Sequence, residues 1–486
     1  MRSSDQSWCA IQQDFWKSLK SLYPLECRLK GQLALASILL SLSVGGCNFT
    51  GVNQSTSKTS NGRELLVWWS EGYYPEETDA IESITRKWEK ATGNKVKLVF
   101  FNDGEISQRA TEILNGGPKP DLMYGYSVGD SHGPTFAYKG FLLETSDVIQ
   151  EFKNDYSPGI IENITFLNKQ TKERHPYSIP LSVSSAYIHY WKDLLQEANE
   201  TDLAINIPDG WNEFWQFWGT NQQKAIQAGF VDIKGIGLPM ASSTSDTHIL
   251  FDFFLEAHEA KIISTSGELL LRKPIEREKV INAMKNYTSF YKKGWVPAKA
   301  TEWGDVDNNI NFLSSLSLMT ANPTLSIPGS QTADEVAYYE RIASVGWPKG
   351  VTGKKVRTDI SVKQMFIFDT NKAEEAKSYA LNLIKPENLS IYVEGSQGRY
   401  LPVLRSILEN PFWNELRNTH IQASRETVEN YKLAYQIYNP AYTEVRRLNI
   451  WAQAIEQVCV NNTPVDVAVD NAIESIESIF KKWERS

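Results

Sequence analysis

Apolar positions along the first part of the chain follow two alternating periods, one typical of strands and one typical of helices. The pattern predicts, in order, a strand, a helix, a strand, a helix and a strand at residues 65–69, 76–91, 95–101, 106–114 and 121–124. In the first of these helices Ile81, Ile84 and Trp88 share one face, and Gly93 stands where a helix would end. This order is typical of a parallel α/β sheet with right-handed crossovers.

Polar loops follow the three predicted strands at residues 70–75, 102–105 and 125–134. Because ligands of parallel sheets bind beyond the carboxyl ends of the strands, these loops are the expected position of a site. The mixed pattern continues, with helices expected at 187–198, 211–228, 246–259, 274–293, 372–384 and 464–483, and strands at 234–239, 317–321 and 361–368. The sequence therefore predicts an α/β fold throughout.

A different apolar pattern lies near the N-terminus, at residues 31–47 (GQLALASILLSLSVGGC). The run is too short to span a membrane comfortably and has small residues before Cys47, which is the layout of a cleaved secretory signal. Its ending also resembles a bacterial lipobox, in which the cysteine is lipidated. Residues 1–46 are thus predicted to be a signal peptide with a lipobox, and residues 47–63 a flexible tether lipidated at Cys47. An uncleaved anchor or a buried apolar helix is the alternative interpretation.

Charge and cysteine content narrow the classes of function. Residues 1–46 hold five Lys/Arg and three Asp/Glu, so the predicted mature chain has 45 basic and 55 acidic residues and a net charge of −10. Nucleic acid is therefore not an expected partner, because phosphate binding needs a basic face. Apart from Cys47, the mature chain would keep one thiol, Cys459, so no intrachain disulfide is predicted. Neither zinc-ligand cysteine spacing nor a HExxH motif is present, and no metal or other cofactor is expected.

Seven short motifs stand in the order found in one family of proteins. They are VWW (67–69), WEKATGNKV (88–96), NGGPKPDLMYG (115–125), YSIPLSVSSAYIHYWKDLL (177–195), GWNEFWQFW (210–218), SLMTANPT (317–324) and QGRYLPV (397–403). On these motifs the chain resembles the extracellular solute-binding protein family 1, the carbohydrate-binding components of bacterial ABC importers. The resemblance extends from about Leu65 to Trp483.

The resemblance implies a two-lobed, periplasmic-binding-protein-like fold of type II, with a ligand cleft between lobes that are joined by crossing strands. It places residues 64–184 and 312–364 in lobe 1, and residues 185–311 and 365–486 in lobe 2. Two positions near the expected cleft depart from the family pattern, because Trp191 stands where Asn is frequent and Pro323 where Gly is common. The identity of the ligand therefore cannot be taken from a relative.

Sugar binding uses flat aromatic rings against the C–H faces of the sugar and polar side chains on its hydroxyls. The chain offers both kinds of side chain in the loops around the expected cleft. The predicted ligand-binding residues are Trp69, Glu71, Tyr73, Tyr74, Tyr126, Ser127, Asp130, Ser185, Trp303, Asn322, Arg399 and Tyr400.

Arg399 bears on the charge of the ligand. An arginine in a cleft can bind a carboxylate or phosphate with two hydrogen bonds, stack on a sugar, or pair with a neighbouring acid such as Glu394. An anionic solute, for example a sugar phosphate, is therefore an alternative ligand. The acidic balance of the other loops favours a neutral sugar or polyol.

A secreted serine hydrolase is the second alternative. Residues 125–129 (GYSVG) follow a predicted strand and match the G-x-S-x-G nucleophile pattern, with Ser127 as nucleophile and His258 or His420 as base. That motif needs a helix directly after the serine, whereas residues 131–134 predict a continuing loop, and no HGGG-type oxyanion segment precedes it. Paired carboxylates for glycoside hydrolysis stay open, because their separation is spatial. A binding protein without catalytic residues is the favoured interpretation.

The resemblance also implies partners and a location. The protein would capture a sugar, oligosaccharide or polyol by lobe closure and deliver it to an ABC permease in the membrane. It would be exported and held by the lipid on Cys47 to the cell membrane, facing the periplasm or the exterior. A monomer is expected.

Overall fold

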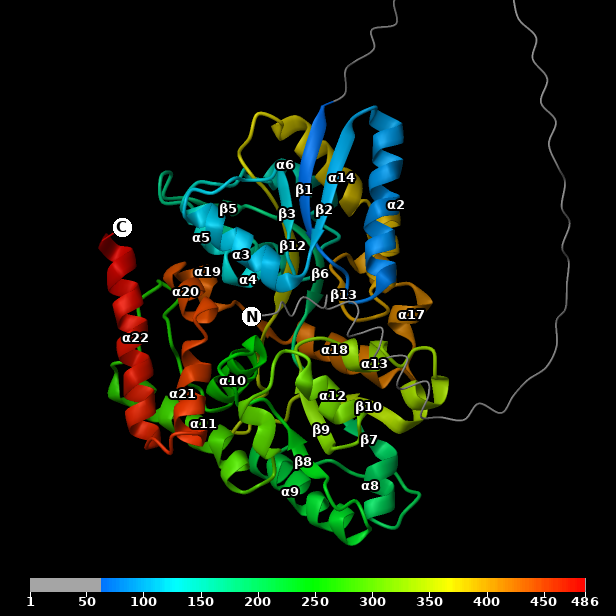
Figure 1. The fold of residues 1–486 in the computed structure, drawn as a ribbon, viewed down its shortest axis with the longest axis vertical. Coiled ribbons are helices and arrows are strands. Elements are labelled where there is room, and N and C mark those ends of the chain that lie inside the picture. Colours follow the sequence, from blue (N-terminus) through cyan, green and yellow to red (C-terminus); the bar gives the residue numbers. More distant parts are fainter. Residues whose placement is uncertain (1–62, 486) are drawn as a thin grey trace, which may run out of the picture. The chain divides into compact units, whose positions relative to one another are not determined.

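The computed structural model describes residues 63–485, and these residues belong to a single compact unit. The predicted signal peptide, the lipidation site Cys47 and the tether, apart from Arg63, lie outside the described residues. Within residues 63–485, no helix combines the length and apolar character needed to cross a membrane. Two separate sheets, each with its own helices, organise the fold (Figure 1).

The sheet of lobe 1 has six strands in the order β13-β6-β12-β3-β1-β2. They are β1 (Glu64–Ser70), β2 (Lys95–Phe101), β3 (Leu122–Tyr124), β6 (Ile179–Ser184), β12 (Ser361–Ile367) and β13 (Leu401–Pro402). β1 is parallel to β2 and β3, whereas β12 is antiparallel to β3 and β6. With α2 (Pro75–Thr92) and α3 (Asp103–Leu114) between the first three strands, the predicted alternation of strands and helices is confirmed.

Local sequence explains where these two helices begin and end. α2 starts at Pro75, whose fixed φ suits a first helical turn, and it ends at Gly93, which has a φ of 76°. α3 starts after Asn102 with a capping box. The Asn102 side chain accepts from the N–H of Glu105, and the Glu105 side chain accepts from the N–H of Asn102.

Lobe 1 also contains several short elements around this sheet. Its other helices are α4 (Val128–Ser131), α5 (Gly133–Tyr138), α6 (Ser146–Ile149), η1 (Gln150–Phe152), α7 (Ile160–Asn163), α14 (Ala373–Ile384), α15 (Pro386–Gly395), α16 (Arg405–Leu408) and α17 (Pro411–Asn414). A hairpin joins β4 (Thr165–Leu167) to β5 (Arg174–Pro176). α15 packs on α2, so segments far apart in the sequence cover the same side of the sheet.

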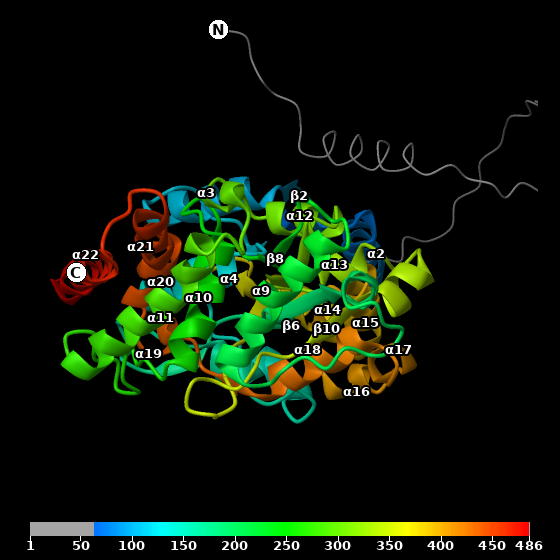
Figure 2. The same cartoon turned by 90° about the horizontal axis from the view of Figure 1, so that it is seen from below.

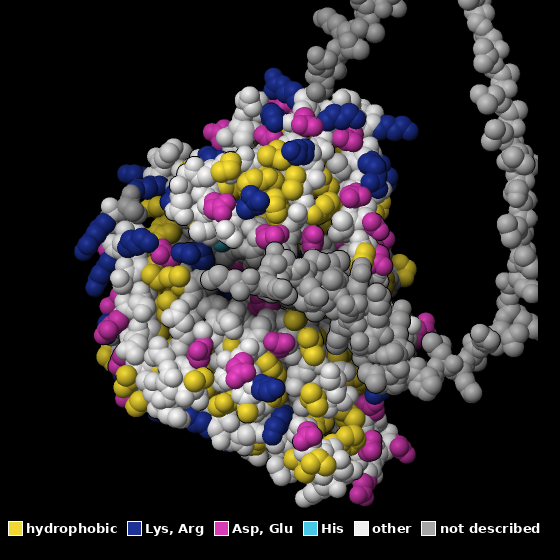
Figure 3. All heavy atoms as spheres, viewed as in Figure 1, with side chains coloured by type: hydrophobic (Ala, Val, Ile, Leu, Met, Phe, Trp, Pro, Cys, Tyr) yellow, Lys and Arg dark blue, Asp and Glu magenta, His cyan; other side chains and the backbone are white. Residues whose placement is uncertain are grey.

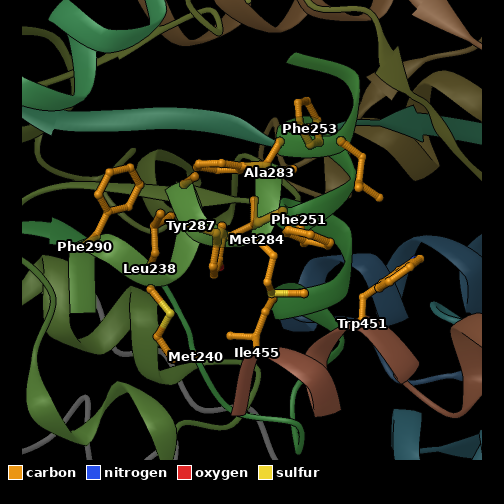
Figure 4. Packing of buried hydrophobic residues seen from close by; sticks show 14 of the residues in the cluster. Leu238, Met240, Phe251, Phe253, Ala283, Met284, Tyr287, Phe290, Trp451 and Ile455 are labelled. Carbon is orange, nitrogen blue, oxygen red and sulfur yellow. The ribbon is translucent and has the colours of Figure 1, made fainter. Parts of the chain in front are cut away.

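The sheet of lobe 2 has the order β10-β7-β9-β8. Its strands are β7 (Tyr187–Trp191), β8 (Lys234–Gly237), β9 (Ser317–Asn322) and β10 (Ile342–Val345). Its helices are α8 (Lys192–Ala198), α9 (Trp211–Gln227), α10 (Ser245–Ala257), α11 (Pro274–Lys292), η2 (Ala298–Thr301), α12 (Asp307–Leu313), α13 (Ser326–Gly329) and η3 (Val336–Arg341). Side chains from α10, α11 and α21, among them Phe251, Tyr287 and Trp451, point toward one another in its core (Figure 4).

The C-terminal segment completes lobe 2 after a short strand pair at the junction of the lobes. β11 (Thr358–Asp359) is parallel to β14 (Tyr431–Lys432). The helices of this segment are α18 (Thr419–Glu429), α19 (Tyr435–Tyr438), α20 (Ala441–Arg447), α21 (Ile450–Cys459) and α22 (Val465–Arg485). α20, α21 and α22 lie side by side at one edge of lobe 2 (Figure 2).

The lobe boundaries expected after residue 311 are wrong. The chain enters lobe 2 between β6 and β7, near Ser185 as expected, but it does not return near Asn311, because β9 pairs with β7 and β8. Every residue of β9 is buried, which requires a central position in a sheet. The chain returns to lobe 1 just before β12, where Met365 pairs with Tyr124, and it crosses a third time through α17 and α18. Residues 312–358 thus belong to lobe 2, and residues 361–414 belong to lobe 1.

Two local predictions also differ from the structure. The helix expected at 187–198 begins only at Lys192, because Tyr187–Trp191 form β7 between β9 and β10. A helix, α4, follows Ser127 directly, although a continuing loop was predicted there. Pro134 lies in the first turn of α5, where its missing N–H costs nothing, so here proline begins a helix.

Charged side chains intermingle on the described surface. In the view of Figure 3, Lys and Arg side chains lie among Asp and Glu side chains on both lobes, with apolar side chains between them. This face therefore carries no large patch of a single charge in its described part.

Candidate functional site

A cleft between the lobes collects polar side chains from both of them. It contains about 790 Å³ of space free of protein atoms, part of which is open to solvent. Lobe 1 contributes Tyr126, Ser127, Asp130, Ser131, Ser361 and Lys363, and lobe 2 contributes Ser245, His248, Asp252, Phe253, Arg446 and Asn449. Ser185, Ala186, Asp359 and Ile360 come from the crossing segments. The part of this space that a water-sized molecule can enter is smaller, about 90 Å³.

The lobe 1 wall is the turn that leads from β3 into α4. The turn is tight, because a Cβ on Gly125 would lie 2.4 Å from Cγ2 of Val128. Ser127 donates its hydroxyl to Oδ2 of Asp103 at 2.9 Å and its backbone N–H to Oδ1 of the same carboxylate at 3.2 Å. Asp130 accepts from the Ser361 hydroxyl at 2.6 Å. The polar groups of this wall are thus hydrogen-bonded to one another.

Lys363 extends this network along β12. Its Nζ donates to the Ser361 hydroxyl at 2.9 Å and lies 3.8 Å from the centre of the Tyr126 ring. Burial lowers the pKa of Lys363 to about 8, while the carboxylates of Asp130 and Asp103 oppose the shift. The amine is therefore a fixed, largely desolvated donor at the edge of the cleft.

The lobe 2 wall is one face of α10, where Ser245, His248 and Asp252 recur at helical spacing. His248 and Asp252 are 1% and 3% exposed, and Nε2 of His248 lies 3.9 Å from Oδ2 of Asp252. Both ring nitrogens of His248 and both carboxylate oxygens of Asp252 lack a hydrogen-bond partner among the described residues. A buried polar group without a partner is costly, so a ligand hydroxyl group that reached these atoms would stabilise the closed cleft.

The charge of Asp252 depends on the groups behind it. Its pKa is raised to about 7. Burial is the largest cause and the neighbouring Asp359 adds to it, whereas Arg446 and Lys432 oppose the shift. Asp359 lies 3.6 Å from Arg446 and 3.5 Å from Lys432. Neither oxygen of Asp359 has a hydrogen-bond partner in the described part of the chain. Glu256 also lies 3.3 Å from Lys432, and it pairs with Arg357 at 2.9 Å. Three acids and three bases thus balance at and behind the floor of the cleft.

Arg399 lies beside the cleft in a cage of acid and aromatic rings. Its guanidinium is 3.7 Å from Oε1 of Glu77, which replaces the expected partner Glu394. The guanidinium carbon lies 4.6 Å from the ring centre of Tyr73, 4.8 Å from that of Tyr126 and 4.9 Å from that of Tyr400. Burial raises the pKa of Glu77 to about 7 although Arg399 opposes the shift. This arginine is enclosed beside Glu77 and does not line the cleft, although its Nε has no hydrogen-bond partner among the described residues.

The two lobes touch on both sides of the cleft. On one side Tyr74 donates its hydroxyl to the Ser326 carbonyl at 3.0 Å, and Leu325 donates its N–H to the Arg399 carbonyl at 3.0 Å. On the other side α20 packs on α4 and α5. Further along that side, Arg174 donates to the Tyr438 carbonyl at 2.9 Å. The structure therefore has the lobes in contact around the cleft.

The structure brings eight of the twelve predicted residues to the cleft or its margin. Tyr126, Ser127, Asp130 and Ser185 line it. Tyr73, Tyr400 and Arg399 form the cage beside Tyr126, and Tyr74 makes the hydrogen bond between the lobes.

The other four predicted residues lie elsewhere. Trp69 is buried in the lobe 1 core, with its ring 4.6 Å from that of Tyr124. Trp303 is buried in the lobe 2 core, and Glu71 is exposed without lining the cleft. Asn322 is buried and donates to the Thr324 carbonyl at 2.8 Å, so it holds the turn after β9. The side chains of the three buried residues serve packing or a local turn.

Sequence reasoning missed most of the lobe 2 wall. His248 and Asp252 lie in a helix that was expected to be structural, and Lys363, Asp359 and Arg446 carried no motif. One signal was present, because His248 and Asp252 interrupt an otherwise apolar helix four residues apart. Two ionisable side chains on the apolar face of a buried helix are typical of a polar site.

Tryptophan does not form the platform that was expected for a sugar. Of the tryptophans in residues 63–485, none lines the cleft. The rings that do line it are those of Tyr126 and Phe253. The Tyr126 ring has Lys363 and Arg399 against it. Phe253 stacks on Trp347, with 4.2 Å between the two ring centres.

The hydrolase arrangement is not assembled around Ser127. α4 does begin directly after this serine, as a nucleophile elbow requires, but its hydroxyl donates to Asp103. His420 hydrogen-bonds Ser344 at 2.7 Å and the Tyr338 carbonyl at 2.8 Å. His258 lies beside Trp211 at the end of α10. Neither histidine is hydrogen-bonded to Ser127, so the pairing of nucleophile and base that acyl transfer needs is missing from this geometry.

Comparisons with known proteins define the class. Residues 83–421 match the family of bacterial extracellular solute-binding proteins, and the chain belongs to this family. The predicted family resemblance is thus confirmed, and the family consists of transport binding proteins rather than enzymes. Membership implies an exported protein that acts outside the cytoplasm.

Individual relatives are distant in sequence but close in fold. The diacetylchitobiose binding protein DasA of Streptomyces coelicolor is 24% identical over 187 residues, which are 38% of this chain and 41% of DasA. The chain therefore matches about two fifths of the length of that relative. Maltose-bound MalE3 of T. maritima is 16% identical, with a TM-score of 0.69 over 86% of this chain and 100% of the other.

A second solved structure is equally similar. A solute-binding protein of an ABC transporter from Thermotoga lettingae, bound to α-D-tagatose, is 19% identical, with a TM-score of 0.69 over 86% of this chain and 100% of the other. At these identities the likeness establishes the fold. The predicted two-lobed α/β architecture with a cleft between the lobes is confirmed.

Proposed function

We propose that this protein is the substrate-binding component of a bacterial ABC importer, and that it captures a sugar or polyol between its lobes. The observation that carries the proposal is the distribution of polar groups around one cavity. Asp130 and Lys363 reach it from lobe 1, and His248 and Asp252 reach it from lobe 2. A ligand that bonds to both walls holds the lobes together.

Capture follows from this division of the site. A ligand in an open cleft meets one wall, whereas in the closed form it meets both, so binding favours closure by the difference in affinity. From the predicted set we assign Tyr126, Ser127, Asp130 and Ser185 to ligand contact. To these we add His248, Asp252, Lys363 and Arg446 because they line the same cavity.

The relatives support the chemical class of the ligand. The protein from T. lettingae binds the sugar α-D-tagatose, MalE3 of T. maritima binds maltose, and DasA is a diacetylchitobiose binding protein. The cleft of this chain offers carboxylates, amines and an imidazole, which are suitable partners for hydroxyl groups. The enclosure of Arg399 by Glu77 and three rings favours a neutral ligand over a sugar phosphate.

The first test is a thermal-shift screen of the purified protein against sugars, polyols, sugar phosphates and amino acids. A ligand at about 100 times its Kd should stabilise the fold by about 2.7 kcal/mol, which is easily seen. A saturable shift with a carbohydrate, without turnover of that compound, is the expected result. Silence toward every carbohydrate, or consumption of the ligand, would overturn the proposal.

The same proposal includes anchoring and delivery. Lipid on Cys47 would keep the protein, acting as a monomer, near a membrane permease and raise its effective concentration there. We expect Cys47→Ser to move the protein from the membrane fraction to the soluble fraction of the exporting cell, with the binding site unchanged. Retention of the variant on membranes would contradict the lipid anchor.

A further inference from the structure

Most of the polar atoms without a hydrogen-bond partner at the floor of the cleft are acceptors. His248, Asp252 and Asp359 line the cavity, and six of their nitrogen and oxygen atoms have no hydrogen-bond partner among residues 63–485. Four of these six atoms are carboxylate oxygens, which accept hydrogen bonds when ionised. These acceptor atoms therefore favour a ligand that is rich in hydrogen-bond donors. The two oxygens of one carboxylate suit two adjacent hydroxyl groups.

The charges at the floor indicate that this ligand is neutral. The acids at and behind the floor are Asp252, Asp359 and Glu256. The bases are Arg446, Lys432 and Arg357, so three acids and three bases come together. A ligand with a full charge would leave an uncompensated charge in a buried site, which is costly. Neutral hydroxyls supply the missing hydrogen bonds without disturbing the balance.

The margins of the cleft limit the length of the ligand. Pro323 lines the cavity, and two residues further on Leu325 is hydrogen-bonded to the Arg399 carbonyl of lobe 1. Arg446 lines the opposite side, where its helix α20 packs on α4 of lobe 1. A chain of several sugar units that extended along the cleft would have to separate one of these lobe contacts.

The aromatic surface of the cleft points the same way. Successive sugar rings of an oligosaccharide need successive flat platforms, and here the Tyr126 ring already has two cations against it while Phe253 stacks on Trp347. Affinity must then come from hydrogen bonds concentrated at the floor. These favour a compact ligand.

We propose that the cleft binds a single-ring, neutral polyol such as a monosaccharide, whose adjacent hydroxyls donate to Asp252 and Asp359 beside His248, and that it does not bind linear oligosaccharides. This inference rests on the proposed function and narrows its ligand class. Asp252 is the principal specificity residue. Both of its oxygens lack a hydrogen-bond partner among the described residues, and only those of Asp359 are also paired with Lys432 and Arg446.

The test is isothermal titration calorimetry of the full protein with two series of compounds. The first compares common monosaccharides and myo-inositol with disaccharides and trisaccharides of the same units. The best single-ring ligand should bind at least about 10-fold more tightly than its own dimer and trimer, because the longer ligands must break lobe contacts. The second series removes one hydroxyl at a time from that ligand. The loss should be about 10- to 100-fold at two adjacent positions, as expected for hydrogen bonds to a charged group.

Variants connect this result to the floor of the cleft. Asp252→Asn and His248→Gln should weaken binding of the best ligand by about 10- to 100-fold. Asp470→Asn is the matched control, because Asp470 pairs with Arg277 on the surface of lobe 2 outside the cleft. Circular dichroism checks that all three variants fold.

The outcomes separate this inference from the proposed function. Affinity that rises with chain length, or an Asp252→Asn variant that binds the monosaccharide as tightly as the wild type, would overturn the inference and leave a carbohydrate importer component. Absence of binding to every carbohydrate would overturn both.

Discussion

The two walls of the cleft differ in how their polar groups are satisfied. In the lobe 1 wall Ser127 is held by Asp103, and Asp130 is joined through Ser361 to Lys363. In the lobe 2 wall His248 and Asp252 are more deeply buried than Ser127 and Asp130, and they have no hydrogen-bond partner within the described chain. The comparison indicates that the two walls have different roles. The polar side chains of the lobe 1 wall are already hydrogen-bonded to one another, whereas those of the lobe 2 wall are available to hydrogen-bond a ligand.

The largest effect on ligand affinity is expected from a substitution in the lobe 2 wall. Asp252→Asn should lower ligand affinity by about 10- to 100-fold, because the carboxylate that accepts two hydroxyls becomes an amide with one acceptor oxygen. Calorimetric titration measures the change. If Ser127→Ala in the lobe 1 wall weakens binding as strongly as Asp252→Asn does, the two walls do not differ in their contribution to ligand binding.

The same residue predicts a pH dependence of stability. The pKa of Asp252 is about 7 in the folded protein against an ordinary value of 3.8, so its contribution to stability is greatest below about pH 4 and is lost as the pH rises through 7. Asp359, Arg446, Lys432 and His248 are the titratable groups that face it. Asp252→Asn removes the buried charge, so without ligand its Tm should exceed the wild-type Tm by about 2 °C at pH 8. The gain should shrink at pH 5, and a gain that is larger at pH 5 than at pH 8 would contradict the raised pKa.

A substitution in the lobe 1 wall should lower the stability of the protein, whereas Asp252→Asn should raise it at pH 8. Ser127→Ala removes a hydrogen bond between the half-buried Ser127 and Asp103, and we expect the free energy of unfolding to fall by about 1–2 kcal/mol. Denaturant unfolding measures this loss. Ser406→Ala, which removes the hydroxyl of the exposed Ser406 from Asp155, is the matched control and should change stability less. Equal losses in the two variants would indicate that the lobe 1 wall is not specially organised.

The smallest effect is expected at the contact between the lobes. Tyr74→Phe removes the hydrogen bond from Tyr74 to the Ser326 carbonyl, which joins lobe 1 to lobe 2 beside the cleft. Since ligand affinity depends on the closed form, binding should weaken by about 3-fold, which is the effect of one neutral hydrogen bond. Tyr291→Phe removes a similar bond to the Ala298 carbonyl inside lobe 2 and should leave affinity unchanged.

The parts of the fold that sequence predicted are those with local causes. The alternation from β1 to β3 follows from short apolar runs, a first-turn proline and a glycine cap, all read within a few residues. The later lobe boundaries depend on which strands pair across long distances. β9 belongs to lobe 2 because it pairs with β7 and β8, and its own sequence cannot reveal those partners.

Among the site residues, too, those with a local signal in the sequence were predicted and the others were not. The turn with Tyr126, Ser127 and Asp130 was predicted because it follows a parallel strand, where ligands bind. Trp69 was misassigned because its place in the strand does not reveal that its ring faces the core beside Tyr124. His248 and Asp252 were missed because a site on the middle of a helix has no loop signal and depends on which face the other lobe approaches.

The position of β12 has a consequence for the time at which the protein can fold. This strand lies between β6 and β3 in the lobe 1 sheet, yet the ribosome makes it after all four strands of the lobe 2 sheet. The middle of the first sheet therefore stays open until most of the chain has been synthesised, and such long-range pairing is slow to form. A chain delayed in this way reaches a membrane before it is folded, which is the state that a translocation channel for extended polypeptides accepts.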